Sequence, residues 1–245
     1  MRKNRVYTPL PLTVCDEVEL PISTSHYLAS VLRLQEKSTC YLFNGDGYEY
    51  TATLITVSKK RVVCHIASCD KIGNESPLSI HLGQGVSRGE RMDYAIQKAV
   101  ECGVNEITPL LSSRCVVKLD SSRASKRQAH WQAVAVSAAE QSGRCVVPTV
   151  NTPISLTAWL AISHAGTKWI ADTTSVNPLV SVDNALSTSV MIGPEGGFTE
   201  EEVVLAQQAG FYSFSLGPRT LRTETATVVA LTLLQSQWGD FRFLE

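Results

Sequence analysis

The sequence contains no apolar run approaching the roughly 18 residues that a membrane-spanning helix needs. Its basic start, residues 1–5, is followed by no apolar core, so we expect no secretory signal. The seven cysteines are an odd number and include no Cys-x-x-Cys pair, which argues against a disulfide framework or a zinc knuckle. The five histidines are scattered without metal-ligand spacing. We therefore expect a cytoplasmic protein with no membrane partner and no metal, whose cysteines are small core residues and not catalytic thiols.

Motifs that bind nucleoside triphosphates are missing as well. There is no Gly-x-x-x-x-Gly-Lys-Ser/Thr sequence, and Gly193–Gly197 does not give Gly-x-Gly-x-x-Gly. An acidic residue, Glu195, lies inside this glycine-rich segment and would repel a phosphate at short range. The sequence therefore argues against a phosphate cradle.

The net charge of −1 does not favour nucleic acid, but the distribution of charge is uneven. Residues 1–132 hold 17 of the 22 lysines and arginines, whereas from Gly193 onward there are three basic and seven acidic residues. A polyanion would therefore meet the first half of the chain, although ordinary surface charge explains the pattern equally well. The candidate phosphate contacts are Arg2, Arg5, Arg33, Lys59, Lys60, Arg61, Arg88, Arg91, Arg114, Lys118, Arg123, Lys126 and Arg127.

Residues 1–72 have the pattern of a small β-barrel domain. Thr39–Phe43 and Tyr48–Val57 are extended runs on either side of Asn44–Gly47 (NGDG), which is a strong hairpin turn. A second turn at 58–60 leads into a strand over 61–68, and a short helix is expected over 26–32. The polar stretch 70–77 is typical of a linker.

From Leu78 to residue 245 the pattern changes to alternating strands and helices, which predicts an α/β domain with a parallel sheet. Strands are expected over 78–83, 106–110, 169–171, 190–192 and 211–216, and helices over 92–102 and 125–142. Thr199 and Glu202 form a capping box that opens another helix, and Thr223 is expected to cap the last one.

Two loops of this domain are candidates for a ligand site. Ile192–Gly197 and Leu216–Ala226 each follow a strand and precede a helix, and glycine lets a ligand approach the main chain closely. Open α/β sheets bind ligands beyond the carboxyl ends of their strands. Asp172 ends a third strand and either borders this pocket or caps its own turn. The alternative for each loop is a tight connection that binds nothing.

Several segments resemble the RsmE family of 16S rRNA (uracil-N3) methyltransferases, which belongs to the SPOUT class. They are Ser87–Met92 with Ile96–Val104, Glu140–Arg144 with Pro148, Ile192–Phe198 and Leu216–Ala226, together with Met1, Arg2, Arg5, Tyr7 and His26–Leu34. The resemblance covers nearly the whole chain. One departure is Gln35–Ser38, where the family usually has a glycine in the turn.

The resemblance implies a PUA-like barrel followed by a parallel-sheet domain with a trefoil knot, and a homodimer with each active site near the dimer interface. It also implies S-adenosylmethionine as the cofactor and 16S rRNA, or the small ribosomal subunit, as the partner, with no role for DNA. The protein would thus act in rRNA processing and ribosome biogenesis. The expected cofactor-binding residues are Asp172, Ile192, Gly193, Pro194, Glu195, Gly196, Gly197, Leu216, Gly217, Leu221, Thr225 and Ala226.

The reaction would be a displacement at a sulfonium methyl group, in which alignment dominates. Uracil N3 loses its proton, and Arg222 or Arg219 would stabilise the resulting negative charge. Glu224 would take the proton or, as we favour, pair with an arginine, because a glutamate beside an arginine is a poor base. Two alternatives remain, namely a SPOUT methyltransferase for another base or for transfer RNA, and an RNA-binding ribosome-assembly factor without catalysis.

Overall fold

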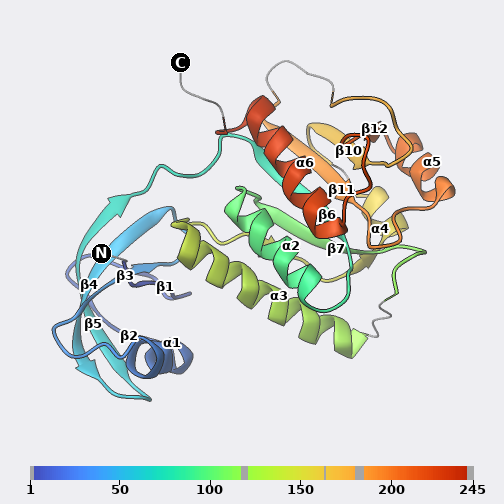
Figure 1. The fold of residues 1–245 in the computed structure, drawn as a ribbon. Helices are drawn as coiled ribbons and strands as arrows, with labels where there is room; N and C mark the ends of the chain where they lie inside the picture. The colour runs from blue at the N-terminus through green and yellow to red at the C-terminus, as the bar shows by residue number, and fades with distance from the viewer. Residues whose placement is uncertain (1–2, 117–120, 163, 180–184, 242–245) are drawn as a thin grey trace. The chain divides into compact units, whose positions relative to one another are not determined.

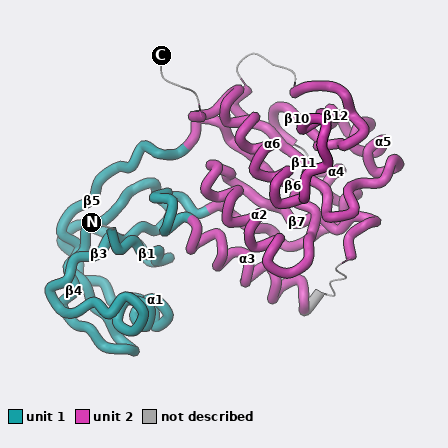
Figure 2. Tube along the Cα trace, viewed as in Figure 1, with its two compact units in different colours: residues 1–75, 139–147 teal, residues 76–138, 148–245 magenta. Residues whose placement is uncertain are grey.

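The computed structural model describes residues 3–116, 121–162, 164–179 and 185–241. The chain forms two compact units (Figure 2). The N-terminal unit consists of residues 1–75 and 139–147, and the C-terminal unit consists of residues 76–138 and 148–245. None of the described helices is both long and apolar enough to cross a membrane.

The N-terminal unit contains a five-stranded sheet in the order β1-β3-β4-β5-β2. Its strands are β1 (Arg5–Tyr7), β2 (Glu17–Glu19), β3 (Thr39–Phe43), β4 (Tyr48–Val57) and β5 (Val62–Lys71). The predicted hairpin joins β3 to β4, with Gly45 and Gly47 at φ values of 100° and 88°. Such positive φ values explain why glycine occupies these turn positions. β5 extends to Lys71, so the first residues of the predicted linker belong to a strand.

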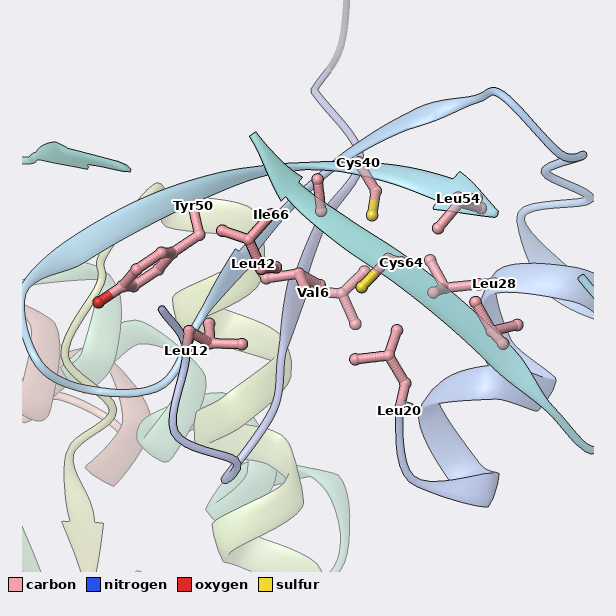
Figure 3. Packing of buried hydrophobic residues seen from close by; sticks show 12 residues of the cluster. Val6, Leu12, Leu20, Leu28, Cys40, Leu42, Tyr50, Leu54, Cys64 and Ile66 are labelled. Carbon is pink, nitrogen blue, oxygen red and sulfur yellow. The ribbon is translucent and has the colours of Figure 1, made fainter. Parts of the chain in front are cut away.

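The core of this unit is made by residues that alternate along the strands. Figure 3 shows Val6, Leu42 and Cys64 from three strands pointing toward Leu20 and Leu28. Leu28 lies in η1 (Tyr27–Val31), a π-helical turn that continues directly from α1 (Ile22–His26). The short helix expected over 26–32 therefore begins earlier and changes its hydrogen-bond pattern at Tyr27.

Arg5 is one of the residues that hold residues 139–147 to the rest of the N-terminal unit. The guanidinium group of Arg5 donates to the carbonyl oxygens of Ala139 and Arg144, both at 3.0 Å, and its Nε donates to Glu49 at 2.6 Å. Its side chain is only 8% exposed. The backbone N–H of Tyr7 adds a bond to the carboxylate of Glu140 at 3.0 Å. One buried arginine thus fastens β1 to a segment more than 130 residues away in the sequence.

The C-terminal unit contains a sheet in which every recorded pairing is parallel, as predicted. The strand order is β12-β10-β11-β6-β7-β8, and β9 pairs with β7. The strands are β6 (Ser79–Gly85), β7 (Glu106–Leu111), β8 (Thr149–Val150), β9 (Ile154–Ser155), β10 (Thr167–Ala171), β11 (Ser187–Ile192) and β12 (Tyr212–Phe214). The two-residue strands β8 and β9 are too short for periodicity to predict.

Helices cover this sheet on two faces. α2 (Glu90–Glu101) and α6 (Thr223–Trp238) lie side by side on one face (Figure 1). α4 (Leu156–Leu160) and α5 (Glu200–Gln208) pack on the other, where Trp159 and Ala206 meet Ile170 and Met191 in one buried cluster. α3 runs over Ser121–Ser142 and so begins four residues before the predicted start.

The chain crosses back over its own sheet near the C-terminus. β12 lies at the edge beyond β10, yet α6, which follows it, packs against α2 and β11. The intervening loop must therefore pass the end of β10 and β11. A return path of this kind is what the resemblance implies for the knot. The two predicted ligand loops lie at the same edge of the sheet because β11 and β12 both run parallel to β10.

Candidate functional site

A cavity of about 190 Å³ lies at the carboxyl ends of β10, β11 and β12 in the C-terminal unit. Three segments that follow these strands supply most of its walls. The lining residues are Arg114, Ala171, Asp172, Thr173, Ile192, Gly193, Pro194, Glu195, Gly196, Gly197, Phe198, Val203, Leu216, Gly217, Arg219, Thr220, Leu221, Thr223 and Ala226. The location is the edge at which parallel α/β sheets bind ligands.

The loop over residues 193–198, which we call the glycine loop, is held by two hydrogen bonds to its own glutamate, Glu195. Glu195 Oε1 accepts the backbone N–H of Arg88 at 3.0 Å and the guanidinium of Arg91 at 3.1 Å. Partial burial opposes ionisation of this carboxyl group, but these hydrogen bonds outweigh it and hold the pKa of Glu195 below its ordinary value. The acidic residue thus serves as an anchor for the glycine loop.

The far side of the glycine loop is tied to the segment after β7. Arg114 Nη1 donates to the carbonyl oxygens of Gly196 and Phe198 at 3.1 and 3.2 Å. Glu202 completes the predicted capping box with Thr199 and also accepts the backbone N–H of Ser113 at 2.7 Å. The capping box is therefore confirmed, and its glutamate has a second, tertiary partner.

Glycine is required at specific points of this site. A Cβ atom on Gly85, the last residue of β6, would lie 2.3 Å from the backbone nitrogen of Pro194. A Cβ on Gly196 would lie 3.0 Å from Cβ of Arg114. Gly217 has a φ of 104°, a conformation that side chains other than glycine rarely adopt. The main chain therefore approaches its neighbours more closely than residues with side chains allow.

The second loop, residues 215–222, leads directly into Thr223, the first residue of α6. The hydroxyl group of Thr223 donates to the carbonyl oxygen of Gly193 at 2.6 Å and accepts a bond from Gln84 Nε2 at 3.1 Å. The sequence predicted Thr223 as the cap of α6, and this is wrong. The N-cap position is Arg222, whose guanidinium has only donors and makes no capping bond, and the hydroxyl of Thr223 donates to Gly193 instead.

Asp172 has both of the roles between which the sequence left a choice. Its Oδ1 accepts the backbone N–H and the hydroxyl of Thr174 at 2.9 and 2.8 Å, so it caps the turn after β10. It also lines the cavity. The turn orients the carboxylate, and the carboxylate forms part of the wall.

The structure brings together all the predicted cofactor-binding residues except one. Thr225, in the first turn of α6, is exposed and does not line the cavity. Of the predicted catalytic residues only Arg219 lines it. Arg222 is exposed, and Oε2 of Glu224 is buried without a hydrogen-bond partner among the described residues. Glu224 and Arg222 form no ion pair recorded for the described part of the chain.

Sequence reasoning missed the lining residues that lie outside the two loops or carry no distinctive pattern. These are Ala171, Thr173, Phe198, Val203, Thr220 and Thr223, and also Arg114, which the sequence predicted only as a phosphate contact. The sequence could have indicated Phe198, because it directly follows the predicted ligand segment Ile192–Gly197. Arg114 had no such signal, because it reaches the site from the segment after β7 through tertiary packing.

The predicted phosphate contacts fall into four groups. Arg5 is buried, and Arg61, Arg91 and Arg114 are exposed but bonded to Glu19, Glu195 and backbone carbonyls. Exposed side chains belong to Arg33, Lys59, Lys60, Arg88, Arg123, Lys126 and Arg127. Arg2 and Lys118 lie outside the described residues. The burial of Arg5 argues against its contact with a phosphate, because its donors already bond within the N-terminal unit.

Comparisons with known proteins agree with this geometry. Residues 74–235 match the family model of an RNA methyltransferase domain, and residues 23–67 match that of an RNA methyltransferase PUA domain. The ribosomal RNA small subunit methyltransferase E of Buchnera aphidicola from Schizaphis graminum is 35% identical over 240 residues, which cover 96% of this chain and 97% of the relative.

Two solved structures share the fold over nearly the whole length. The methyltransferase E of Neisseria gonorrhoeae, bound to S-adenosylmethionine, is 40% identical with a TM-score of 0.91. A putative methyltransferase of Legionella pneumophila, also with bound S-adenosylmethionine, is 38% identical with a TM-score of 0.91. In both comparisons 98% of this chain and 100% of the other are covered. The expected fold class, a parallel α/β domain preceded by a PUA-like β unit, is thereby confirmed. The chain belongs to the ribosomal RNA small subunit methyltransferase E family of RNA methyltransferases.

Proposed function

We propose that this protein binds S-adenosylmethionine in the cavity between the glycine loop and the 215–222 loop, and that it methylates N3 of a uridine in 16S ribosomal RNA. Family membership supports RNA methylation. The observation that carries the cofactor assignment is the cavity itself, because loops that follow β10, β11 and β12 close around one space at the carboxyl edge of the sheet.

The residues present fit the chemistry of this cofactor. S-adenosylmethionine joins an adenosine, with its flat adenine ring, to an amino acid that bears a sulfonium, an amine and a carboxylate. Gly193, Gly196 and Gly217 expose main chain to the adenosine, whose edges hydrogen-bond to backbone groups. Asp172 offers a carboxylate to hydroxyl or amine donors, and Arg114 offers a cation to the ligand's carboxylate.

The cofactor supplies an activated methyl group, and the chain supplies alignment and charge. Arg219 borders the cavity, so it is the first candidate for stabilising the negative charge that develops on the uracil ring. Arg222 precedes α6 and is exposed, so it reaches a substrate from outside the cavity. Both side chains present a planar fork of donors.

We propose that the RNA backbone contacts the exposed basic side chains of the N-terminal unit, in particular Lys59 and Lys60 in the turn between β4 and β5. Their side chains are exposed, unlike that of Arg5, and phosphate contacts position RNA without selecting its sequence. Changing both to Ala is expected to lower RNA affinity and to reduce the log-log salt slope by roughly one unit per lost contact, or somewhat less for single strands.

We also propose a homodimer that acts in the cytoplasm. α6 carries no charged residue after Glu224, and Leu233 on this helix is 39% exposed. A second copy would bury this uncharged face. None of the cysteines in the described part of the chain forms a disulfide, which suits a reducing compartment.

Two experiments test the proposal. Calorimetry of the purified protein with S-adenosylmethionine must show saturable binding, and its absence would favour an assembly factor without catalysis. Mass mapping of nucleotides in 16S rRNA from a deletion strain, with and without the gene restored, must show one N3-methyluridine that depends on this protein. A protein-dependent methyl group on another base or in transfer RNA would refute the N3-uridine assignment and leave the methyltransferase assignment intact.

A further inference from the structure

A hydroxyl group joins the two loops of the cavity. Thr223 begins α6, directly after the 215–222 loop, and donates to the carbonyl oxygen of Gly193 at the start of the glycine loop over 2.6 Å. Thr223 is 5% exposed and lines the cavity. A buried neutral hydrogen bond is sensitive to the loss of either partner, because the remaining group is left without water or a partner.

Gln84, in the core of the sheet, determines that the Thr223 hydroxyl is the donor in its bond to Gly193. Gln84 in β6 is fully buried and donates from Nε2 to the Thr223 hydroxyl at 3.1 Å. Its Oε1 accepts the hydroxyl of Thr227, one turn further along α6, at 2.6 Å. Because the amide nitrogen only donates, the Thr223 oxygen is the acceptor, and its single hydrogen is left for the carbonyl of Gly193.

The next residue of β6 supports the same peptide group sterically. Gly85 leaves no room for a side chain, since its Cβ would lie 2.6 Å from the carbonyl carbon of Gly193 and 2.3 Å from the nitrogen of Pro194. The peptide between Gly193 and Pro194 is therefore held by close packing against β6 and by the hydroxyl from α6. Neither contact requires the ligand.

We propose that Thr223, oriented by Gln84, is a positioning residue that fixes the carbonyl of Gly193 and so holds both loops in the arrangement that binds S-adenosylmethionine. The inference rests on the proposed cofactor site. It assigns a part in cofactor affinity to two groups, the buried amide of Gln84 in β6 and the hydroxyl of Thr223 at the start of α6. The sequences of the two loops do not indicate this role. Loss of the hydroxyl would uncouple the loops, while the shape of the sheet stays the same.

The test compares four variants of the full-length protein with the wild type. Thr223→Val removes the hydroxyl at nearly constant volume, and Thr223→Ser keeps it. Gln84→Glu replaces the donating amide by an acceptor. The matched control is Thr188→Val, because Thr188 is also a buried threonine with one side-chain partner, Thr167, but lies at the opposite end of β11 from the cavity.

Calorimetry with S-adenosylmethionine is expected to show a Kd raised roughly ten- to a hundredfold in Thr223→Val and in Gln84→Glu, the scale of one lost buried hydrogen bond. Thr223→Ser and Thr188→Val are expected to keep a Kd near the wild-type value, even where Thr188→Val lowers the melting temperature as much as Thr223→Val does. An equal Kd in Thr223→Val, Thr188→Val and the wild type would overturn the inference while the cofactor assignment stands.

Hydrogen exchange of the ligand-free protein gives a second measurement that does not depend on the cofactor. Thr223→Val is expected to speed exchange at the amides of residues 195–198 and 219–222 together, and Thr188→Val is expected not to do so. Failure of the wild type to bind S-adenosylmethionine would reject the proposed function. Unchanged exchange at both loops in Thr223→Val would reject the coupling itself.

Discussion

Replacing Arg5 by Leu is expected to destabilise the N-terminal unit and to leave the chemistry of the cavity alone. The Arg5 side chain is 8% exposed, as is that of its partner Glu49, and the two atoms that join them lie 2.6 Å apart. Removing one member of a buried ion pair typically costs 3–5 kcal/mol, because the other charge stays buried without its partner. The carbonyl oxygens of Ala139 and Arg144 lose a donor as well.

Two features of the structure refine this magnitude. Lys3 also contacts Glu49 at 2.6 Å, and this remaining partner is 53% exposed, so it compensates only in part. We therefore expect a loss of about 3 kcal/mol in the free energy of unfolding of the N-terminal unit. Lys3→Ala, the control, is expected to cost less than about 1 kcal/mol. Arg5→Leu combined with Glu49→Leu is expected to be less destabilised than Arg5→Leu alone, because no charge is left buried.

The chain offers a convenient way to follow the two units separately. All four tryptophans, at positions 131, 159, 169 and 238, belong to the C-terminal unit. Urea unfolding followed by tryptophan fluorescence therefore reports that unit, while hydrogen exchange at the amides of β3, β4 and β5 reports the N-terminal one. If Arg5→Leu weakens RNA binding with unchanged protection of these strands, the structural role of Arg5 is refuted and it is a phosphate contact.

Three further predictions concern the cavity and the pH dependence of stability. Gly217→Val is expected to abolish calorimetric binding of S-adenosylmethionine in a folded protein, because φ is 104° there, and near-native binding would contradict the site. Arg219→Ala is expected to lower the methylation rate at saturating substrates about ten- to a thousandfold. This loss is expected to exceed that of Arg222→Ala. A larger loss in Arg222→Ala would make Arg222 the charge-stabilising group. Burial lowers the pKa of His81 to about 4, so the folded state disfavours protonation of this imidazole. The free energy of unfolding is therefore expected to fall by up to about 3 kcal/mol as pH drops from about 6.5 to 4. Urea midpoints that do not fall over this range in the wild type, or that fall as steeply in His81→Gln, would contradict that assignment.

The sequence by itself determined those features that depend on residues close together along the chain. The turn at Gly45 and Gly47 needs positive φ values at two nearby positions, and the capping box of Thr199 and Glu202 needs partners three residues apart. Alternation of apolar strands and helices predicted the parallel sheet, and the position of the glycine loop after a strand predicted the edge at which the cavity lies.

Only the tertiary structure decided which polar side chains are buried and what they hold. Arg5 has the same sequence features as an exposed phosphate contact, but it is fastened to Glu49 and to carbonyls more than 130 residues away. Gln84 lies in an apolar strand without a motif, yet it orients Thr223, 139 residues further on. A hydrogen bond across such a separation depends on strand order and helix packing, which no local pattern encodes, so the supports of the cavity appear only once the sheet is assembled.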